Sequence, residues 1–205
     1  MQETTDKEPS FPGAEEEALD KTWTGLKFGG AAASRQFHGC LFKNCDFTGA
    51  EFRGCRFTDC RFESCNLSLL RLPRTALSSV SFKNSKLTGV NWTEAAWPRV
   101  KLPGLLRFDN CVLADSVFLG LHLRETSIVN CRAVGADFRE ADLAKADLAG
   151  TDLAGVLFGG TNLSGANLAG ARNYAIRPAD NVLKGARFSM PEAMALLYCL
   201  DIKII

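Results

Sequence analysis

Eight cysteines carry the most evident chemical potential in this chain, because thiolates bind metals and form disulfides. Seven share one position of a five-residue repeat: Cys40, Cys45, Cys55, Cys60, Cys65, Cys111 and Cys131. In stacked coils, side chains at one repeat position run parallel, so neighbouring sulfur atoms are poorly oriented for a disulfide. They also do not converge on a point, as a tetrahedral zinc site requires. The pattern therefore favours buried thiols that serve as small apolar side chains.

The remaining candidates for chemistry are two histidines and a set of aspartates. His38 and His122 occupy outward repeat positions, with no spacing typical of metal ligands or a catalytic triad. Asp142, Asp147 and Asp152 each precede a repeat centre, so we expect them on successive sides of a coil as turn and surface groups. The chain also lacks a phosphate-binding glycine loop and a nucleophile elbow. We therefore predict a protein that is not an enzyme and binds no metal or cofactor.

A five-residue period organises most of the chain. Large apolar residues recur at every fifth position from Phe37 to Leu102 and, after one extra residue, from Phe108 to Leu168. The residue two before each centre is usually small. The residue two after it is glycine twelve times, out of 18 glycines in the chain, which indicates a repeated turn.

Period five excludes the ordinary elements. On an α-helix five residues advance a side chain by about 500°, so the centres would form no stripe. On a straight strand, side chains alternate faces and an odd period would expose every second centre. A chain that turns by about 90° after each pentad places every centre inside. The prediction is an all-β fold, a quadrilateral β-helix of about seven coils and about 30 Å in length at the inter-strand spacing.

The repeat sets the expected domain boundaries. Residues 1–21 hold seven acids and two lysines and predict a disordered acidic tail. An amino-terminal cap at 22–36, the β-helix at 37–170 and a carboxyl-terminal cap and dimerisation segment at 171–205 follow. The single extra residue near Pro103 predicts a local bulge. Because no secretion signal or membrane span is evident, we expect a cytoplasmic location and no membrane contact.

The carboxyl terminus has a different pattern. Ser189 and Glu192 match a helix capping box, and apolar residues follow at helical spacing. The predicted short helix exposes more apolar surface than one narrow coil can cover. We therefore expect a homodimer through it, with a monomeric cap as the alternative. The expected interface residues are Met194, Leu197, Tyr198 and Leu200.

Three stretches make the assignment more specific: NLSLLRLPRT, GVNWTEAAWPRVKL and NYAIRPADNVLKGARFSMPEAMALLYCLDIKI. They resemble the Qnr and MfpA group of pentapeptide-repeat proteins, and within it the albicidin-resistance branch. The resemblance implies a right-handed square β-helix, a dimer through the carboxyl-terminal helix, and binding to DNA gyrase that relieves poisoning by topoisomerase inhibitors. The long projecting loops of many Qnr proteins have no expected counterpart, because only one residue interrupts the period.

Relatives in this group resemble DNA in shape and acidity, so acidic residues are the candidate gyrase-contact surface: Asp137, Glu140, Asp142, Asp147 and Asp152. The repeat also places a row of bases on one side of the coil: Lys43, Arg61, Lys83, Lys101, Arg124 and Lys145. That row is open to three interpretations: a solvated face, an acidic-protein contact or a weak DNA contact. Overall we expect no direct nucleic-acid binding. The competing hypothesis is a scaffold module with an unrelated partner.

Overall fold

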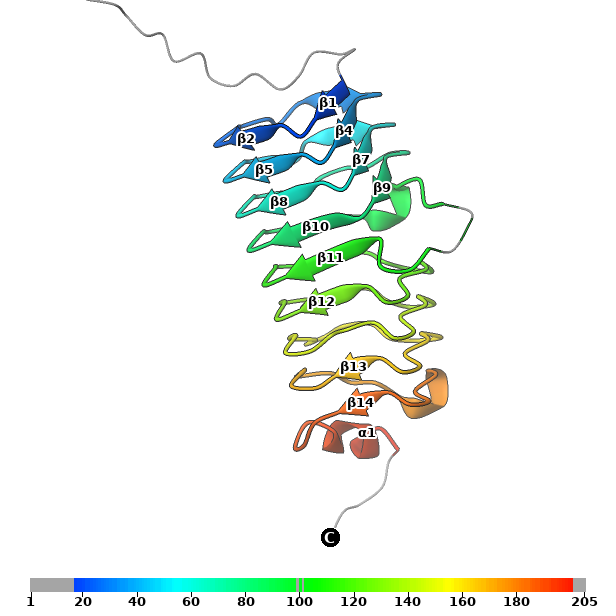
Figure 1. Cartoon of the computed structure of the whole chain (residues 1–205). Helices are drawn as coiled ribbons and strands as arrows, with labels where there is room; N and C mark the ends of the chain where they lie inside the picture. The colour runs from blue at the N-terminus through cyan, green and yellow to red at the C-terminus, as the bar shows by residue number, and fades with distance from the viewer. Residues whose placement is uncertain (1–16, 99, 101, 201–205) are drawn as a thin grey trace, which may run out of the picture.

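The chain forms a parallel β-solenoid of about eight turns, with one short helix at its carboxyl-terminal end (Figure 1). The computed structural model describes residues 17–98, 100 and 102–200. Its strands are β1 (Glu17–Leu19), β2 (Thr22–Thr24), β3 (Ala31–Ala33), β4 (Gln36–His38), β5 (Leu41–Lys43), β6 (Glu51–Arg53), β7 (Arg56–Thr58), β8 (Arg61–Glu63), β9 (Ala76–Ser78), β10 (Val80–Lys83), β11 (Leu106–Asp109), β12 (Ser127–Val129), β13 (Asn167–Leu168) and β14 (Arg187–Phe188). Two 3-10 turns, η1 (Trp92–Glu94) and η2 (Pro178–Asp180), and helix α1 (Met194–Tyr198) complete the elements.

Successive turns pair in register as parallel strands. In the longest sheet, of order β12-β11-β10-β8-β5-β2, Phe42 lies opposite Phe62 and Phe62 opposite Phe82. Isolated parallel bridges continue the ladders where strands are too short to be assigned, as between Asp147 and Asn167. The repeat centres therefore stack in columns, which confirms the predicted β-helix.

The corner between sides falls two residues after each centre. Residues at this position adopt left-handed backbone with φ near +60°, as in Gly150 at +67° and Lys145 at +58°. Side chains in this conformation crowd the backbone, so glycine is favoured at the corners. This geometry accounts for the twelve glycines found at one position of the repeat.

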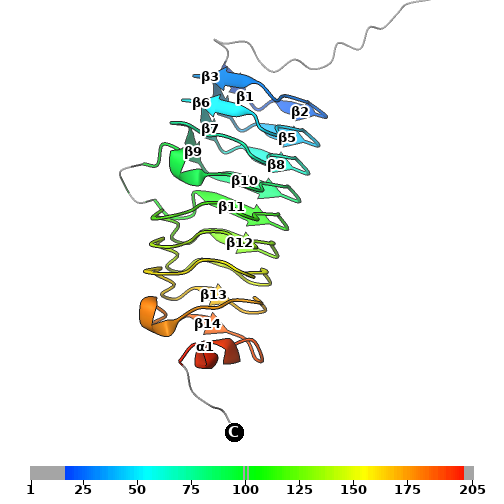
Figure 2. The ribbon, with the colours of Figure 1, turned by 180° about the vertical axis from the view of Figure 1, so that it is seen from behind.

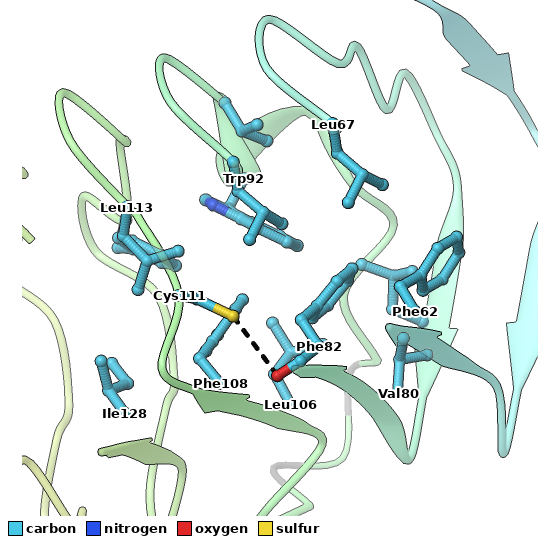
Figure 3. Packing of buried hydrophobic residues seen from close by; sticks show 14 of the residues in the cluster. Phe62, Leu67, Val80, Phe82, Trp92, Leu106, Phe108, Cys111, Leu113 and Ile128 are labelled. Atoms are coloured by element: carbon cyan, nitrogen blue, oxygen red, sulfur yellow. Dashed lines mark hydrogen bonds between the residues drawn. The ribbon is translucent and has the colours of Figure 1, made fainter. Parts of the chain in front are cut away.

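Aromatic rings fill the amino-terminal part of the core. Phe37 stacks on Phe57, and Phe42 on Phe62, with ring centroids 4.7 Å apart in both pairs. The small side chains two residues before each centre lie beside these columns. Where such a side chain carries a thiol or a hydroxyl, that group can donate a hydrogen bond to a backbone carbonyl of the preceding solenoid turn. Figure 3 shows one case, in which the Cys111 thiol donates to the Phe82 carbonyl across 3.4 Å.

One turn is longer than predicted, and this corrects the sequence frame. Phe82 pairs with Phe108, 26 residues on, where the other turns of this sheet repeat at about 20. The insertion is thus a whole pentad and one residue, and it forms a loop that projects from the rod between η1 and β11 (Figures 1 and 2). Trp97 is only half-buried and Leu102 is exposed, so neither is the inward centre that the period predicted.

Both ends of the solenoid also differ from expectation. Glu17–Leu19, expected in the tail, forms β1 against β4, because Ala18 fits a small core position opposite Phe37. The rest of the tail, 1–16, lies outside the described residues, as does 201–205. At the other end β14 pairs with β13, so the ladder continues beyond residue 170.

The predicted capping box is wrong. The Ser189 hydroxyl accepts a hydrogen bond from the Gly170 N–H at 3.1 Å and so serves the last full turn of the solenoid. Helix α1 begins only at Met194. Its N-cap residue is Ala193, and no side chain forms a capping hydrogen bond there. No helix among the described residues is long and apolar enough to cross a membrane.

Candidate interaction surfaces

The cysteines occupy the predicted inward positions. All seven repeat cysteines are buried, and their thiols donate to backbone carbonyls, as Cys40 does to Ala18 at 3.3 Å. Burial raises the pKa of Cys60 to about 12. A thiol in this state is a poor nucleophile at neutral pH. Within the described residues, no group of three or more His, Cys, Asp or Glu side chains is arranged to hold a metal ion.

The five acidic residues of the candidate gyrase-contact surface do not share one face. Asp137 and Glu140 belong to one side, and Asp142, Asp147 and Asp152 to the next three sides in turn, as bridges to separate columns show. The carboxylates therefore encircle one turn as a belt. We name this set, Asp137, Glu140, Asp142, Asp147 and Asp152, the acidic belt.

Most carboxylates of the acidic belt accept hydrogen bonds that stabilise the turns of the solenoid. Asp142, Asp147 and Asp152 each accept a hydrogen bond from the backbone N–H two residues later, at 3.1 to 3.2 Å, the geometry of an Asx turn. Asp142 and Asp147 also accept from Asn162 and Asn167 of the next turn, at 2.9 Å. These bonds support the predicted role as turn groups.

Ion pairs neutralise three members of the acidic belt. Asp137 pairs with Arg139 at 2.7 Å, and this hydrogen-bonded arginine lowers the pKa of Asp137. Asp142 pairs with Arg124 and Asp152 with Arg172, both at 3.4 Å. Glu140 differs, since it is exposed at a corner with φ of +60°. Glu140 is therefore the member of the acidic belt most available to a partner.

The predicted row of bases is broken by the long turn. Arg61 and Lys83 lie on the side that continues through Arg107 in β11. Arg124 instead adjoins the column of His122 and Asp142, which belongs to the adjacent side. Lys101 falls outside the described residues. The six bases thus do not form one row.

A different basic feature lies on the first turns. Four exposed arginines surround the corner between the β6 column and the β7 column, and we call this set the arginine edge: Arg53, Arg56, Arg71 and Arg74. Backbone pairing fixes their proximity, because the Gly54 N–H donates to the Pro73 carbonyl at 2.9 Å and Glu51 is bridged to Arg71. Sequence reasoning missed this set, although placing each arginine on the four-sided frame would have revealed it.

The carboxyl-terminal helix presents a divided surface. Ala195 and Leu196 pack against the core, whereas Leu197, Tyr198 and Leu200 are exposed by 38%, 66% and 48%. Met194 is half-buried. The residues expected at a dimer interface belong to α1 or follow it directly, and α1 lies at the free end of the rod, beyond its last turn (Figure 1).

Comparisons with solved structures identify the same architecture elsewhere. Full-length QnrB1, a plasmid-mediated fluoroquinolone resistance protein, matches with a TM-score of 0.60 at 19% identity, covering 91% of this chain and 100% of that one. A trypsin-treated QnrB1 variant gives 0.65 at 18%, covering 90% and 100%. HetL, a protein of heterocyst differentiation regulation from the cyanobacterium Nostoc sp. strain PCC 7120, gives 0.50 at 15%, covering 82% and 85%. At these identities the likeness establishes the fold.

Sequence models of one family cover most of the solenoid. A model described as a pentapeptide repeat region matches residues 35–106, and one described as pentapeptide repeats (8 copies) matches 107–143 and 141–172. No curated protein matches the sequence significantly. The matched residues are those whose centres fill the core and whose corners turn through left-handed backbone, so the chain belongs to the pentapeptide-repeat family.

Proposed function

We propose that this chain is a cytoplasmic, non-enzymatic protein that binds DNA gyrase and protects it from topoisomerase poisons. The observation that carries the proposal is the likeness to QnrB1, which covers 91% of this chain and 100% of that one. The three sequence stretches that resemble the Qnr and MfpA group support it. Within that group we place the chain nearest to the albicidin-resistance protein AlbG on the same stretches.

Rod length is part of the proposal. About eight turns at about 4.8 Å each give a rod of about 38 Å, which equals about eleven base pairs of duplex at 3.4 Å. We propose that two chains join end to end through α1, which doubles this length. The exposed Leu197, Tyr198 and Leu200 are the surface that such a dimer would bury. Closed two-fold symmetry requires a self-complementary patch of this kind.

Mimicry of DNA by charge would act through a small part of the acidic belt. Turn hydrogen bonds and ion pairs occupy Asp137, Asp142 and Asp152, so these carboxylates present little free charge. Glu140 is exposed and lies in the carboxyl-terminal half, near the proposed dimer centre. We therefore assign Glu140 the largest share of any gyrase contact that the acidic belt makes.

The test is a supercoiling assay with purified gyrase, with and without albicidin or a fluoroquinolone. Wild-type protein should restore supercoiling in the presence of at least one poison. Leu197→Asp should give a folded monomer by light scattering that no longer protects. Leu119→Asp is the matched control, since Leu119 is 40% exposed, close to the 38% of Leu197, and two further turns follow its own along the ladder before the carboxyl-terminal end. Full protection by the Leu197→Asp monomer would refute the dimer requirement.

The alternative is a scaffold module with a partner other than gyrase. The likeness to HetL favours it, because the same solenoid occurs in a protein of differentiation control. The occupied carboxylates of the acidic belt also weaken an electrostatic mimic. Failure of wild-type protein to protect against either poison, together with no binding to gyrase in sedimentation, would favour this alternative.

A further inference from the structure

The arginine edge combines high positive charge with open access. Four arginines and two acidic residues, Glu51 and Glu94, lie at this corner, which leaves a net charge of +2 over neighbouring turns. Arg56 and Arg74 are exposed. Small residues occupy the outward positions between the arginines, Ala33, Ser34, Gly54, Pro73 and Ala76. A partner can therefore approach the guanidinium groups along a flat surface.

Glu51 orders part of this edge. It lies between two arginines and pairs with Arg53 at 2.6 Å and with Arg71 at 2.7 Å. The hydrogen bond from Arg53 lowers the pKa of Glu51, so the carboxylate stays charged at neutral pH. One carboxylate thus holds two guanidinium planes in place. More than half of each arginine side chain remains exposed, at 53% and 58%.

We propose that the arginine edge binds the phosphate backbone of duplex DNA. Guanidinium groups pair with phosphates through two parallel hydrogen bonds, and arginine suits this geometry better than lysine. The edge covers one turn spacing, about 5 Å along the rod. A duplex carries one charge per about 1.7 Å of axis, so about three phosphates lie within that length. This proposal departs from the expectation that nucleic acid is not a partner.

An acidic protein is the competing occupant, and the edge suits it less well. Protein interfaces concentrate binding energy in buried apolar and aromatic anchors. The outward positions between the four arginines are instead small, so they offer few such anchors. Protein–DNA interfaces are more polar and more positive. The surface chemistry therefore favours a phosphate backbone.

The test measures DNA binding by the full chain without gyrase, so its result is independent of the proposed function. Fluorescence anisotropy of a labelled duplex is followed from about 25 to about 200 mM salt. Three or four phosphate contacts predict a slope of about −3 in log K against log salt. Arg56→Glu/Arg74→Glu should weaken binding at least about tenfold and make the slope less steep by about 2.

The matched control is Arg132→Glu/Arg187→Glu, which makes the same charge change at exposed positions on other sides. It should bind DNA nearly as well as wild type. Arg56→Gln/Arg74→Gln removes the charges without reversing them and should give an intermediate loss. Circular dichroism verifies folding of every variant. Equal losses in the edge and control variants, or a wild-type slope near zero, would overturn the proposal. Equal competition by poly-L-glutamate per unit charge would assign the edge to an acidic protein instead.

Discussion

Replacing Leu148 with arginine tests the pentad frame at its centre. Leu148 is 0% exposed, and its column neighbours Ile128 and Leu168 are equally buried. The substitution forfeits about 2–3 kcal/mol of apolar burial. It also places an unpaired guanidinium in the core, which costs about 3–5 kcal/mol more. The free energy of unfolding should therefore fall by about 5 kcal/mol or more, which lowers Tm by at least about 10 °C in a chain of this size.

The control is Ala169→Arg, which places the same side chain at an exposed, outward position of the same side, one turn further on. Its effect should stay within about 0.5 kcal/mol. Both variants are compared by thermal and urea unfolding, monitored by far-ultraviolet circular dichroism. If the two variants shift the midpoint equally, Leu148 is not a core centre and the frame is refuted.

Two further predictions concern the corners and the carboxylates. Gly150→Val should destabilise more than Gly120→Val by about 0.5 kcal/mol, because the exposed Asn130 amide has to turn aside. Both corners have φ of +67°, but a Cβ at residue 150 would lie 2.5 Å from Asn130 Oδ1, whereas residue 120 has open space; equal urea midpoints would contradict this. Asp137 and Asp152 have lowered pKa values in the folded state, so they stabilise it above their unfolded pKa of about 3.9, and this stability is lost as pH falls further. The urea midpoint should be flat from about pH 7 to about pH 5 and fall below about pH 4, less steeply in Asp137→Asn/Asp152→Asn.

The core was predictable because the residue types within each pentad indicate which side chains point inward and where the backbone turns. A large residue such as Phe57, a small one two positions before it and a left-handed corner two positions after it are local features, and the structure places them as expected. Only the inward direction of a side chain follows from the pentad. The side on which a residue lies depends on how many pentads precede it in a turn.

This distinction explains the misassigned row of bases. Leu102 satisfies the period, so nothing in its own pentad reveals that it belongs to a projecting loop. The 26-residue separation of Phe82 and Phe108 becomes evident only when strands pair. Every residue after the loop therefore lies one side earlier in the turn than the uninterrupted period predicts. The arginine edge precedes the loop and is unaffected.

The same reasoning explains why the number of acidic residues overestimates the free negative charge of the acidic belt. A carboxylate directly before a centre has two uses: it can face a partner, or it can accept the N–H that follows the centre. The backbone N–H is the nearer group, and the Asp147 carboxylate accepts a hydrogen bond from the Ala149 N–H. The Asn167 side-chain amide donates a second hydrogen bond to the same carboxylate. Sequence shows the position of a carboxylate in the repeat but not the donors that the adjacent turn supplies.

A dimer joined through α1 would hold two arginine edges at its outer ends. From the turn of Phe62 to that of Phe188 there are six turn spacings, about 29 Å, and the two α1 helices between the rods add about 10 Å each, so the two edges lie about 80 Å apart. A duplex of about ten base pairs is too short to reach both, whereas one longer than about 24 base pairs spans them. Bivalent contact should then raise the apparent affinity at least about tenfold between duplexes of 10 and 30 base pairs. The Leu197→Asp monomer should lose this jump while keeping its affinity for the short duplex. A length dependence that is the same in monomer and wild type would refute this arrangement of the two edges.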